Sequence, residues 1–231
     1  MAVAASVASV LWAPLSPVAD ASVCPAGAAN RNACVSITFD GMGLNADGVG
    51  CSGAFPGTLN GVRYLVSAGH CYRPGAQVSE VNGQVIGSYE SGTPDDLRAM
   101  SFGYSLIRLN NNISTNSITF EPGPHLVNLY AVDMNPQTGQ QICLSGWTSR
   151  STCGSIAEVH DNYILADGMG SEQGDSGGVV YRSTGYGKGA IIGILIGKND
   201  ETHQSIIQPV GNLFWAIESD RGAQLIPDFV Y

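Results

Sequence analysis

Charged residues are scarce in this chain, and basic residues are the scarcer kind. They make up 13% of the 231 residues, with 10 Lys and Arg against 19 Asp and Glu, so the formal net charge is −9. Proteins that bind nucleic acids usually present a basic surface, and anionic membrane surfaces attract basic segments. We therefore expect neither a nucleic acid nor a membrane surface as a partner.

The chain also lacks a long uninterrupted apolar run. Residues 2–18 are apolar apart from serines, but Pro14 and Pro17 interrupt them, so the run is too short and broken to span a membrane. Ala19-Asp20-Ala21 has the A-x-A form that predicts cleavage after Ala21. We expect residues 1–21 to be a signal peptide or leader; an ordered apolar arm is the alternative, because no basic residue precedes Arg31.

No two cysteines have C-x-x-C spacing, which disfavours zinc, the alternative use of the six cysteines. Their even number and order suggest three local disulfides in an oxidising compartment. The sequence thus predicts a secreted, extracellular protein whose cysteines do not bind zinc. The cysteines expected to pair are Cys24 with Cys34, Cys51 with Cys71, and Cys143 with Cys153.

Turn-forming residues are plentiful, with 30 Gly and 11 Pro, and they separate short apolar runs. This pattern predicts an all-β fold of two packed six-stranded antiparallel β-barrels, spanning about 34–118 and about 125–212 of a domain at 22–231. Only Gly211–Glu218 has helical spacing, which predicts a short C-terminal helix. The expected strands are Val35–Phe39, Val62–Ser67, Gln84–Ser88, Ser105–Leu109, Ser117–Phe120, Leu126–Val132, Gln141–Leu144, Tyr163–Ala166, Gly178–Arg182 and Ala190–Ile196.

The run Gly174-Asp175-Ser176-Gly177-Gly178 can expose a serine hydroxyl on a tight turn. Acyl transfer needs such a nucleophile beside two backbone N–H groups that hold a developing oxyanion. A plain hairpin turn is the alternative, since these residue types all favour turns. A matching base is His70, which ends the apolar run Leu65-Val66-Ser67-Ala68-Gly69 and precedes Cys71. His125, His160 and His203 have no such context.

These two motifs resemble those of the chymotrypsin-like serine peptidases, and secreted bacterial members in particular. The segments Cys51-Ser52-Gly53, Cys143-Leu144-Ser145-Gly146-Trp147-Thr148 and Gln208-Pro209-Val210 resemble them too. The resemblance implies that His70 is the base, that Ser176 is the nucleophile, and that N–H groups of Gly174 and Ser176 form the oxyanion hole. It implies a monomeric endopeptidase that acts on polypeptides through an acyl-enzyme, a reaction that requires no metal or cofactor.

The sequence departs from the family where the aspartate that orients the histidine should begin a strand, because Gly103 stands there. Asp95 and Asp96 lie in a turn that could fold back, and Asp96 is our candidate for the third catalytic residue. Ile196 replaces a serine that usually bonds that aspartate. Three outcomes are open: a working peptidase, a slow His–Ser pair, or a pseudo-peptidase that binds polypeptides without cutting them.

The family pattern also indicates which residues surround the substrate pocket. They are Gly170, Glu172 and Ile196, and no aspartate falls where a trypsin-like pocket would hold one. We expect a pocket for a medium apolar side chain rather than for Lys or Arg. Leu144 replaces a basic residue that would pair with Asp175, so we expect Arg150 or a processed N-terminus to pair with Asp175 instead.

Overall fold

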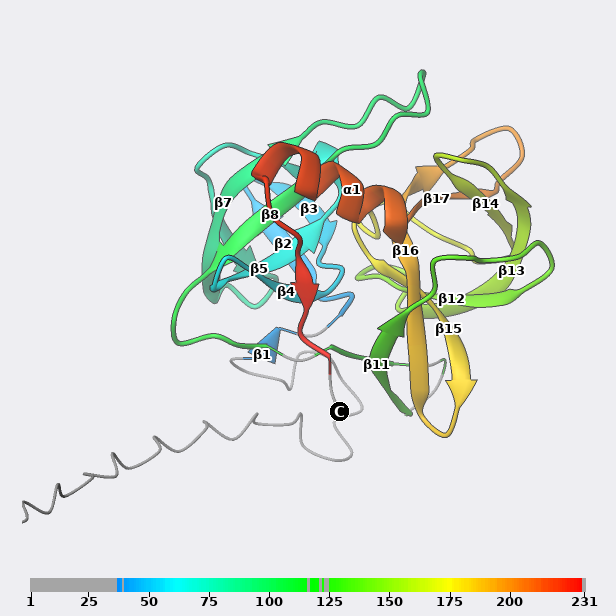
Figure 1. The fold of residues 1–231 in the computed structure, drawn as a ribbon, viewed down its shortest axis with the longest axis horizontal. Helices are drawn as coiled ribbons and strands as arrows, with labels where there is room; N and C mark the ends of the chain where they lie inside the picture. The colour runs from blue at the N-terminus through cyan, green and yellow to red at the C-terminus, as the bar shows by residue number, and fades with distance from the viewer. Residues whose placement is uncertain (1–36, 39, 116, 121, 123–124, 230–231) are drawn as a thin grey trace, which may run out of the picture.

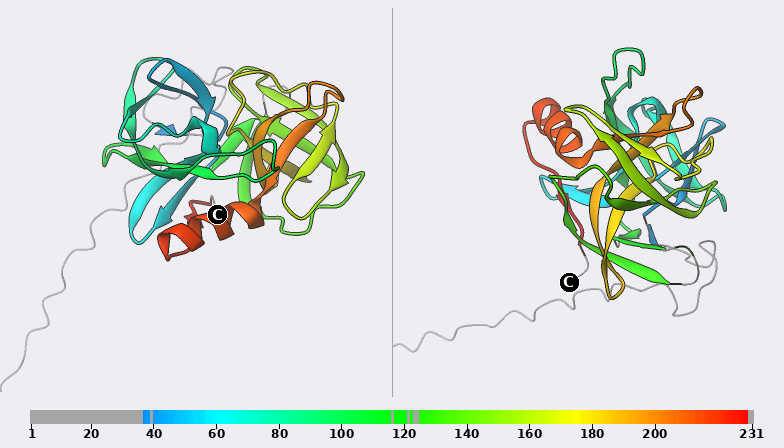
Figure 2. Two further views of the ribbon diagram at one scale, coloured as in Figure 1. Left: turned by 90° about the horizontal axis from the view of Figure 1, so that it is seen from above. Right: turned by 90° about the vertical axis from the view of Figure 1, so that its right-hand side faces the viewer.

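The computed structural model describes residues 37–38, 40–115, 117–120, 122 and 125–229 (Figure 1). The expected leader and the expected Cys24–Cys34 disulfide lie outside these residues. The described chain forms two halves built from β-strands, side by side, with one α-helix lying across both (Figures 1 and 2). The predicted all-β fold with a short C-terminal helix is confirmed.

The first half contains a sheet with the strand order β18-β4-β5-β8-β7-β6-β2-β3. Segments β3 and β4 follow one another in the chain and are separated only by residues 53–55, so they form one bent run. Because β3 pairs with β2 and β4 pairs with β5, this run closes the sheet into a barrel. The strands are β2 (Gly43–Ala46), β3 (Val49–Ser52), β4 (Pro56–Leu59), β5 (Val62–Ser67), β6 (Gln77–Glu80), β7 (Val85–Thr93), β8 (Tyr104–Leu109) and β18 (Ile226–Pro227), beside the separate pair β1 (Ile37–Thr38) and β9 (Ser114–Thr115).

The second half has the strand order β10-β11-β16-β15-β12-β13-β14-β17, and β16 also pairs with β17. This extra pairing closes the strands β16-β15-β12-β13-β14-β17 into the second barrel. Strands β10 and β11 extend the sheet beyond this barrel. The strands are β10 (Ile118–Phe120), β11 (Leu126–Val132), β12 (Gln141–Ser145), β13 (Ser151–Val159), β14 (Ile164–Asp167), β15 (Val179–Gly185), β16 (Lys188–Lys198) and β17 (Ser205–Pro209).

The helix α1 (Val210–Arg221) covers the junction of the two barrels with its apolar side. Its buried Phe214 packs edge-on against Phe55 of the first barrel, with ring centroids 6.2 Å apart. The helix ends at Gly222, which adopts the left-handed conformation (φ 66°) that favours glycine. Within the described residues, no helix has both the length and the apolar character of a membrane span.

Candidate active site

His70 lies in the 3₁₀ turn η2 (Gly69–Cys71), directly after β5. A disulfide joins the next residue, Cys71, to Cys51 of β3, which fixes the backbone of the turn. The imidazole is 38% exposed, so it is accessible from solvent. The turn and its disulfide therefore hold His70 at the junction of the barrels with one side open.

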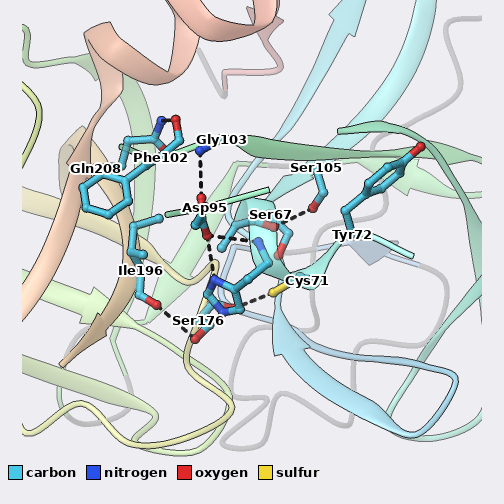
Figure 3. A network of polar contacts seen from close by, with 12 residues as sticks. Ser67, Cys71, Tyr72, Asp95, Phe102, Gly103, Ser105, Ser176, Ile196 and Gln208 are labelled. Carbon is cyan, nitrogen blue, oxygen red and sulfur yellow. Dashed lines mark hydrogen bonds and ion pairs between the residues drawn. The ribbon is translucent and has the colours of Figure 1, made fainter. Parts of the chain in front are cut away.

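Asp95 contacts this histidine from the β7–β8 connection (Figure 3). Its Oδ2 lies 2.6 Å from Nδ1 of His70 and also accepts a hydrogen bond from the backbone N–H of His70, at 3.0 Å. Its Oδ1 accepts from the backbone N–H of Gly103, at 2.8 Å. The side chain is only 1% exposed, so both of its oxygens are buried and hydrogen-bonded. A carboxylate here can fix the tautomer and orientation of the imidazole.

Asp96, our sequence-based candidate for this carboxylate, points elsewhere. Its Oδ1 accepts from the backbone N–H groups of Arg98 and Ala99, at 3.0 and 3.1 Å, and its backbone pairs with Ser101. Asp96 therefore caps the exposed turn of the β7–β8 connection. It does not contact His70 as Asp95 does, because the side chains of these two adjacent residues point in different directions. The carboxylate beside His70 belongs to Asp95.

Gly103 stands where the resemblance places an aspartate, and the packing explains why it has no side chain. A Cβ on Gly103 would lie 1.9 Å from the carbonyl oxygen of Thr93, well inside van der Waals contact. Its N–H instead donates to Asp95. The carboxylate thus reaches His70 from a position eight residues earlier in the chain.

The turn that carries Ser176 is tied to the first barrel by Ser52. The carbonyl of Ser176 accepts from the N–H of Ser52 at 2.8 Å, and that of Gly174 accepts from Ser52 Oγ, also at 2.8 Å. Gly177 needs to be glycine, because its φ is 85° and a Cβ would lie 2.1 Å from Oγ of Ser67. These contacts bring the serine turn and the histidine turn to the same junction.

Two backbone N–H groups of this turn, those of Gly174 and Ser176, donate no hydrogen bond to any described residue. Gly174 has a φ of 99°, which glycine adopts without strain. The hydroxyl of Ser176 donates to the carbonyl of Ile196, at 3.3 Å. The turn therefore offers a hydroxyl and two unused N–H donors close together.

Asp175, directly before the serine, is fully buried. Its carboxylate accepts from the backbone N–H groups of Thr148, Ser149 and Glu172, at 2.7, 3.0 and 2.9 Å. Arg150, an expected partner, instead places its guanidinium over the Trp147 ring, 5.2 Å from the centroid. Backbone donors thus satisfy the buried charge, and no described side-chain cation pairs with it. A processed N-terminus, the other expected partner, lies outside the described residues.

Beside Ser176 lies a cavity of about 270 Å³ with a polar wall. Glu172 lines it as expected, whereas Gly170 does not, and the side chain of Ile196 is buried in the core between the barrels. The medium apolar pocket expected from the sequence is therefore not what the wall presents. Its lining residues, none of them histidine, are Ser171, Glu172, Gln173, Ser176, Leu195, Gly197, Lys198 and Asp200.

The described cysteines form two of the three expected disulfides, Cys51–Cys71 and Cys143–Cys153. The second joins neighbouring strands, β12 and β13. Ligand atoms of Cys51, His70 and Cys71 lie within 4.8 Å of one another, as in some metal sites. Both sulfurs are oxidised to the disulfide, so they offer no thiolate to a metal.

No family model matches the chain. An uncharacterized protein of Mycobacterium tuberculosis is 30% identical over 167 residues, which are 69% of this chain and 73% of that protein. Glutamyl endopeptidase 2 of Streptomyces griseus is 30% identical over 151 residues, 60% and 76% of the two chains. The solved structure of a glutamic acid specific serine protease, described as using a novel histidine triad in substrate binding, matches with a TM-score of 0.65 at 25% identity and covers 81% of this chain and 100% of that one.

Proposed function

This chain belongs to the chymotrypsin-like serine peptidases, and on that premise we propose that it is a serine endopeptidase with the triad His70, Asp95 and Ser176. One contact carries the proposal, the 2.6 Å approach of Asp95 Oδ2 to Nδ1 of His70. An Nδ1–H that donates to this carboxylate leaves Nε2 of His70 free to act as the base.

The reaction follows from these positions. Nε2 of His70 takes the proton of the Ser176 hydroxyl as Oγ attacks the peptide carbonyl carbon. The carbonyl electron pair moves to oxygen, and the N–H groups of Gly174 and Ser176 stabilise that oxyanion. The C–N bond then breaks, and His70 returns the proton to the leaving amine. Water attacks the acyl-enzyme by the same route and releases the new carboxylate and Ser176.

Before attack, the Ser176 hydroxyl has to turn from the Ile196 carbonyl, its present acceptor, to His70. A backbone N–H of the bound polypeptide can take over that carbonyl. Substrate binding and activation of the nucleophile are then linked, because the Ile196 carbonyl exchanges the Ser176 hydroxyl for the N–H of the substrate.

The pseudo-peptidase alternative rested on Gly103 and Ile196. Asp95 supplies a carboxylate that Gly103 lacks, and the N–H of Gly103 helps to hold it. Ile196 cannot donate to the carboxylate, but both oxygens of Asp95 already accept backbone hydrogen bonds. We therefore favour the working peptidase.

The proposed setting is extracellular, and the proposed form is a monomer that acts on polypeptides. The two described disulfides support the first point, because disulfides persist in oxidising compartments. N-terminal sequencing of the protein from culture medium tests the proposed cleavage after Ala21, and light scattering tests the monomer.

For substrate choice we propose a polar side chain at the residue before the cut bond, with preference for an acidic one. Lys198 lines the cavity beside Ser176 and makes no ion pair with any described acid, so its ammonium is available to a substrate carboxylate. The carboxylates of Glu172 and Asp200 line the same cavity and oppose this preference. Ser171 and Gln173 add neutral polar groups. The relative from S. griseus is named a glutamyl endopeptidase, which agrees with this preference. No histidine lines the described cavity, so we do not propose that a histidine triad binds the acidic side chain.

Active-site labelling with a fluorophosphonate tests the proposed nucleophile. The intact protein should be labelled on Ser176, and Ser176→Ala should abolish the label while the protein stays folded. Ser183→Ala is the matched control, because Ser183 is an exposed serine on β15. Folded protein that resists the probe would contradict the proposal.

A further inference from the structure

A second cavity, also of about 270 Å³, lies against the start of α1 and the end of the β7–β8 connection. It shares no residue with the cavity beside Ser176, so both can be occupied at once. No charged side chain is among its lining residues, which are Ser101, Phe102, Asn162, Gln208, Asn212, Trp215 and Ala216. The wall therefore combines two aromatic rings with neutral amide and hydroxyl groups.

Gln208 is the buried part of this wall, with 1% of its surface exposed. Its Nε2 donates to the carbonyl of Phe102 at 3.3 Å, but its Oε1 has no hydrogen-bond partner among the described residues. A buried acceptor without a partner is destabilising, because it has lost its hydrogen bonds to water. Gln208 lines the cavity but its Oε1 is buried, so a ligand that donates an O–H or N–H would satisfy Oε1 once the amide turns toward the cavity.

Trp215 lies at the opposite extreme, with 72% of its surface exposed. An indole so exposed on a helix offers a flat apolar face with its N–H at one edge. Asn212, one turn earlier on α1, also lines the cavity, and its Nδ2 donates to the carbonyl of Asp161 at 2.9 Å. The same helix thus contributes an apolar face and a fixed amide to the lining.

We propose that this cavity binds one sugar residue of an uncharged carbohydrate. A sugar ring has an apolar C–H face that can stack on Trp215, and hydroxyls that can donate to Oε1 of Gln208 and bond to the amide of Asn212. Ligand pockets usually exceed about 300 Å³, so a cavity of this size suits one ring better than a longer chain. The neutral wall disfavours a charged ligand, which would lose its hydration without an ion pair.

The cavity also borders the group that holds Asp95. The carbonyl of Phe102, bonded to Gln208, and the N–H of Gly103, bonded to Asp95, belong to the same peptide group (Figure 3). A ligand bound to Gln208 would therefore lie next to the peptide group that holds Asp95, while the cavity beside Ser176 stays open. The protein could stay attached to a glycan while its other cavity holds a polypeptide.

Saturation-transfer NMR of the intact protein with a panel of methyl glycosides tests this, and it requires no peptidase activity. The panel contains hexosides, pentosides and N-acetylhexosaminides, with N-acetyl-Gly-Ser-Asn-amide, whose blocked termini carry no charge, as a peptide probe. We expect at least one glycoside to bind and Trp215→Ala to weaken its affinity at least tenfold. Tyr186→Ala, the loss of a fully exposed tyrosine at the β15–β16 turn, should leave the affinity unchanged.

Gln208→Met provides a second variant, since it keeps the length of the side chain but removes Oε1, together with the Nε2 that donates to Phe102. It should weaken the same glycoside at least threefold while circular dichroism stays unchanged; if Gln208→Met unfolds, the Trp215→Ala result alone decides. The proposal is overturned if no glycoside binds, if Trp215→Ala binds as the parent does, or if only the peptide binds.

Discussion

The backbone N–H of Gly103 donates a 2.8 Å hydrogen bond to Oδ1 of Asp95, whose Oδ2 contacts His70. The glycine that takes the place of the expected aspartate thus helps to hold the carboxylate that replaces it. The carboxylate comes from a loop that folds back over the strand end. A missing residue in a strand pattern therefore does not mean a missing group in the site.

A side chain at Gly103 should not be tolerated. Gly103→Ala places a Cβ 1.9 Å from the Thr93 carbonyl, and overpacking of this kind costs about 1–3 kcal/mol of unfolding free energy. Urea unfolding measures this, with Gly50→Ala as the control, because a Cβ at Gly50 meets nothing within 4 Å. Equal stability of the two variants would contradict the packing described here.

Asp175 should matter for the oxyanion hole although it never touches substrate. Asp175→Asn replaces one of the two acceptor oxygens by an NH2 group that cannot accept from a backbone N–H, so at least one of the three hydrogen bonds should be lost and the turn should lose its shape. We expect kcat/KM for a peptide substrate to fall about 100-fold or more, the scale of losing one oxyanion donor. Arg150→Ala should change it little, because Arg150 lies over Trp147 and does not pair with Asp175. A large fall in kcat/KM for Arg150→Ala would instead support the pairing of Arg150 with Asp175 that the sequence predicted.

Glu80 should make the fold less stable as the pH rises. Burial raises its pKa from 4.5 to about 7, and the hydrogen bond from Asn82 lowers it only in part. The folded state then holds the proton more tightly than the unfolded state, so this contribution is present below about pH 4.5 and is lost as the pH rises through 7. The loss amounts to roughly 3 kcal/mol at most.

Urea unfolding at a series of pH values checks this. Glu80→Gln should flatten the decline, and Glu201→Gln, a change at an exposed turn, should not. Part of the fall in stability with rising pH should persist in Glu80→Gln, because burial and the nearby charge of Asp228 also raise the pKa of Asp40. A slope unchanged in Glu80→Gln would show that Glu80 titrates normally.

Lys198 should govern the preference for an acidic side chain. Lys198→Met removes the ammonium from the cavity beside Ser176 and keeps most of the side-chain length. In a peptide library, we expect cleavage after Glu to drop at least tenfold relative to cleavage after Gln, which lacks the charge. Strongest cleavage after Leu or Phe in the parent protein would instead support the apolar pocket expected from the sequence.

The sequence predicted much of this because the relevant signals are local. Val62–Ser67 and Leu126–Val132 are strands with the predicted bounds, and the contexts of His70 and Ser176 lie within a few residues of each. The choice between Asp95 and Asp96 is not local. It depends on which of two adjacent side chains faces inward when the β7–β8 connection folds back on η2, and no periodicity reports that.

Other features were missed for related reasons. Short strands such as β2 and β6 carry too few apolar residues to be recognised, although each pairs with the next strand in the chain, β3 and β7 respectively. The backbone donors of Asp175 have no sequence signature, because any residue supplies an N–H. The same is true of the acceptor that Gln208 leaves unpaired, which becomes visible only once the barrels are packed together.

The most direct test of the account compares peptide hydrolysis by Asp95→Asn and Asp96→Asn with that of the parent protein. Loss of the carboxylate that orients the histidine costs about 10⁴ in turnover in a complete triad, so kcat should fall by about that factor in Asp95→Asn. Asp96→Asn should keep kcat close to the parent value, because Asp96 only caps an exposed turn. An unchanged kcat in Asp95→Asn, or a large fall confined to Asp96→Asn, would contradict the assignment of Asp95.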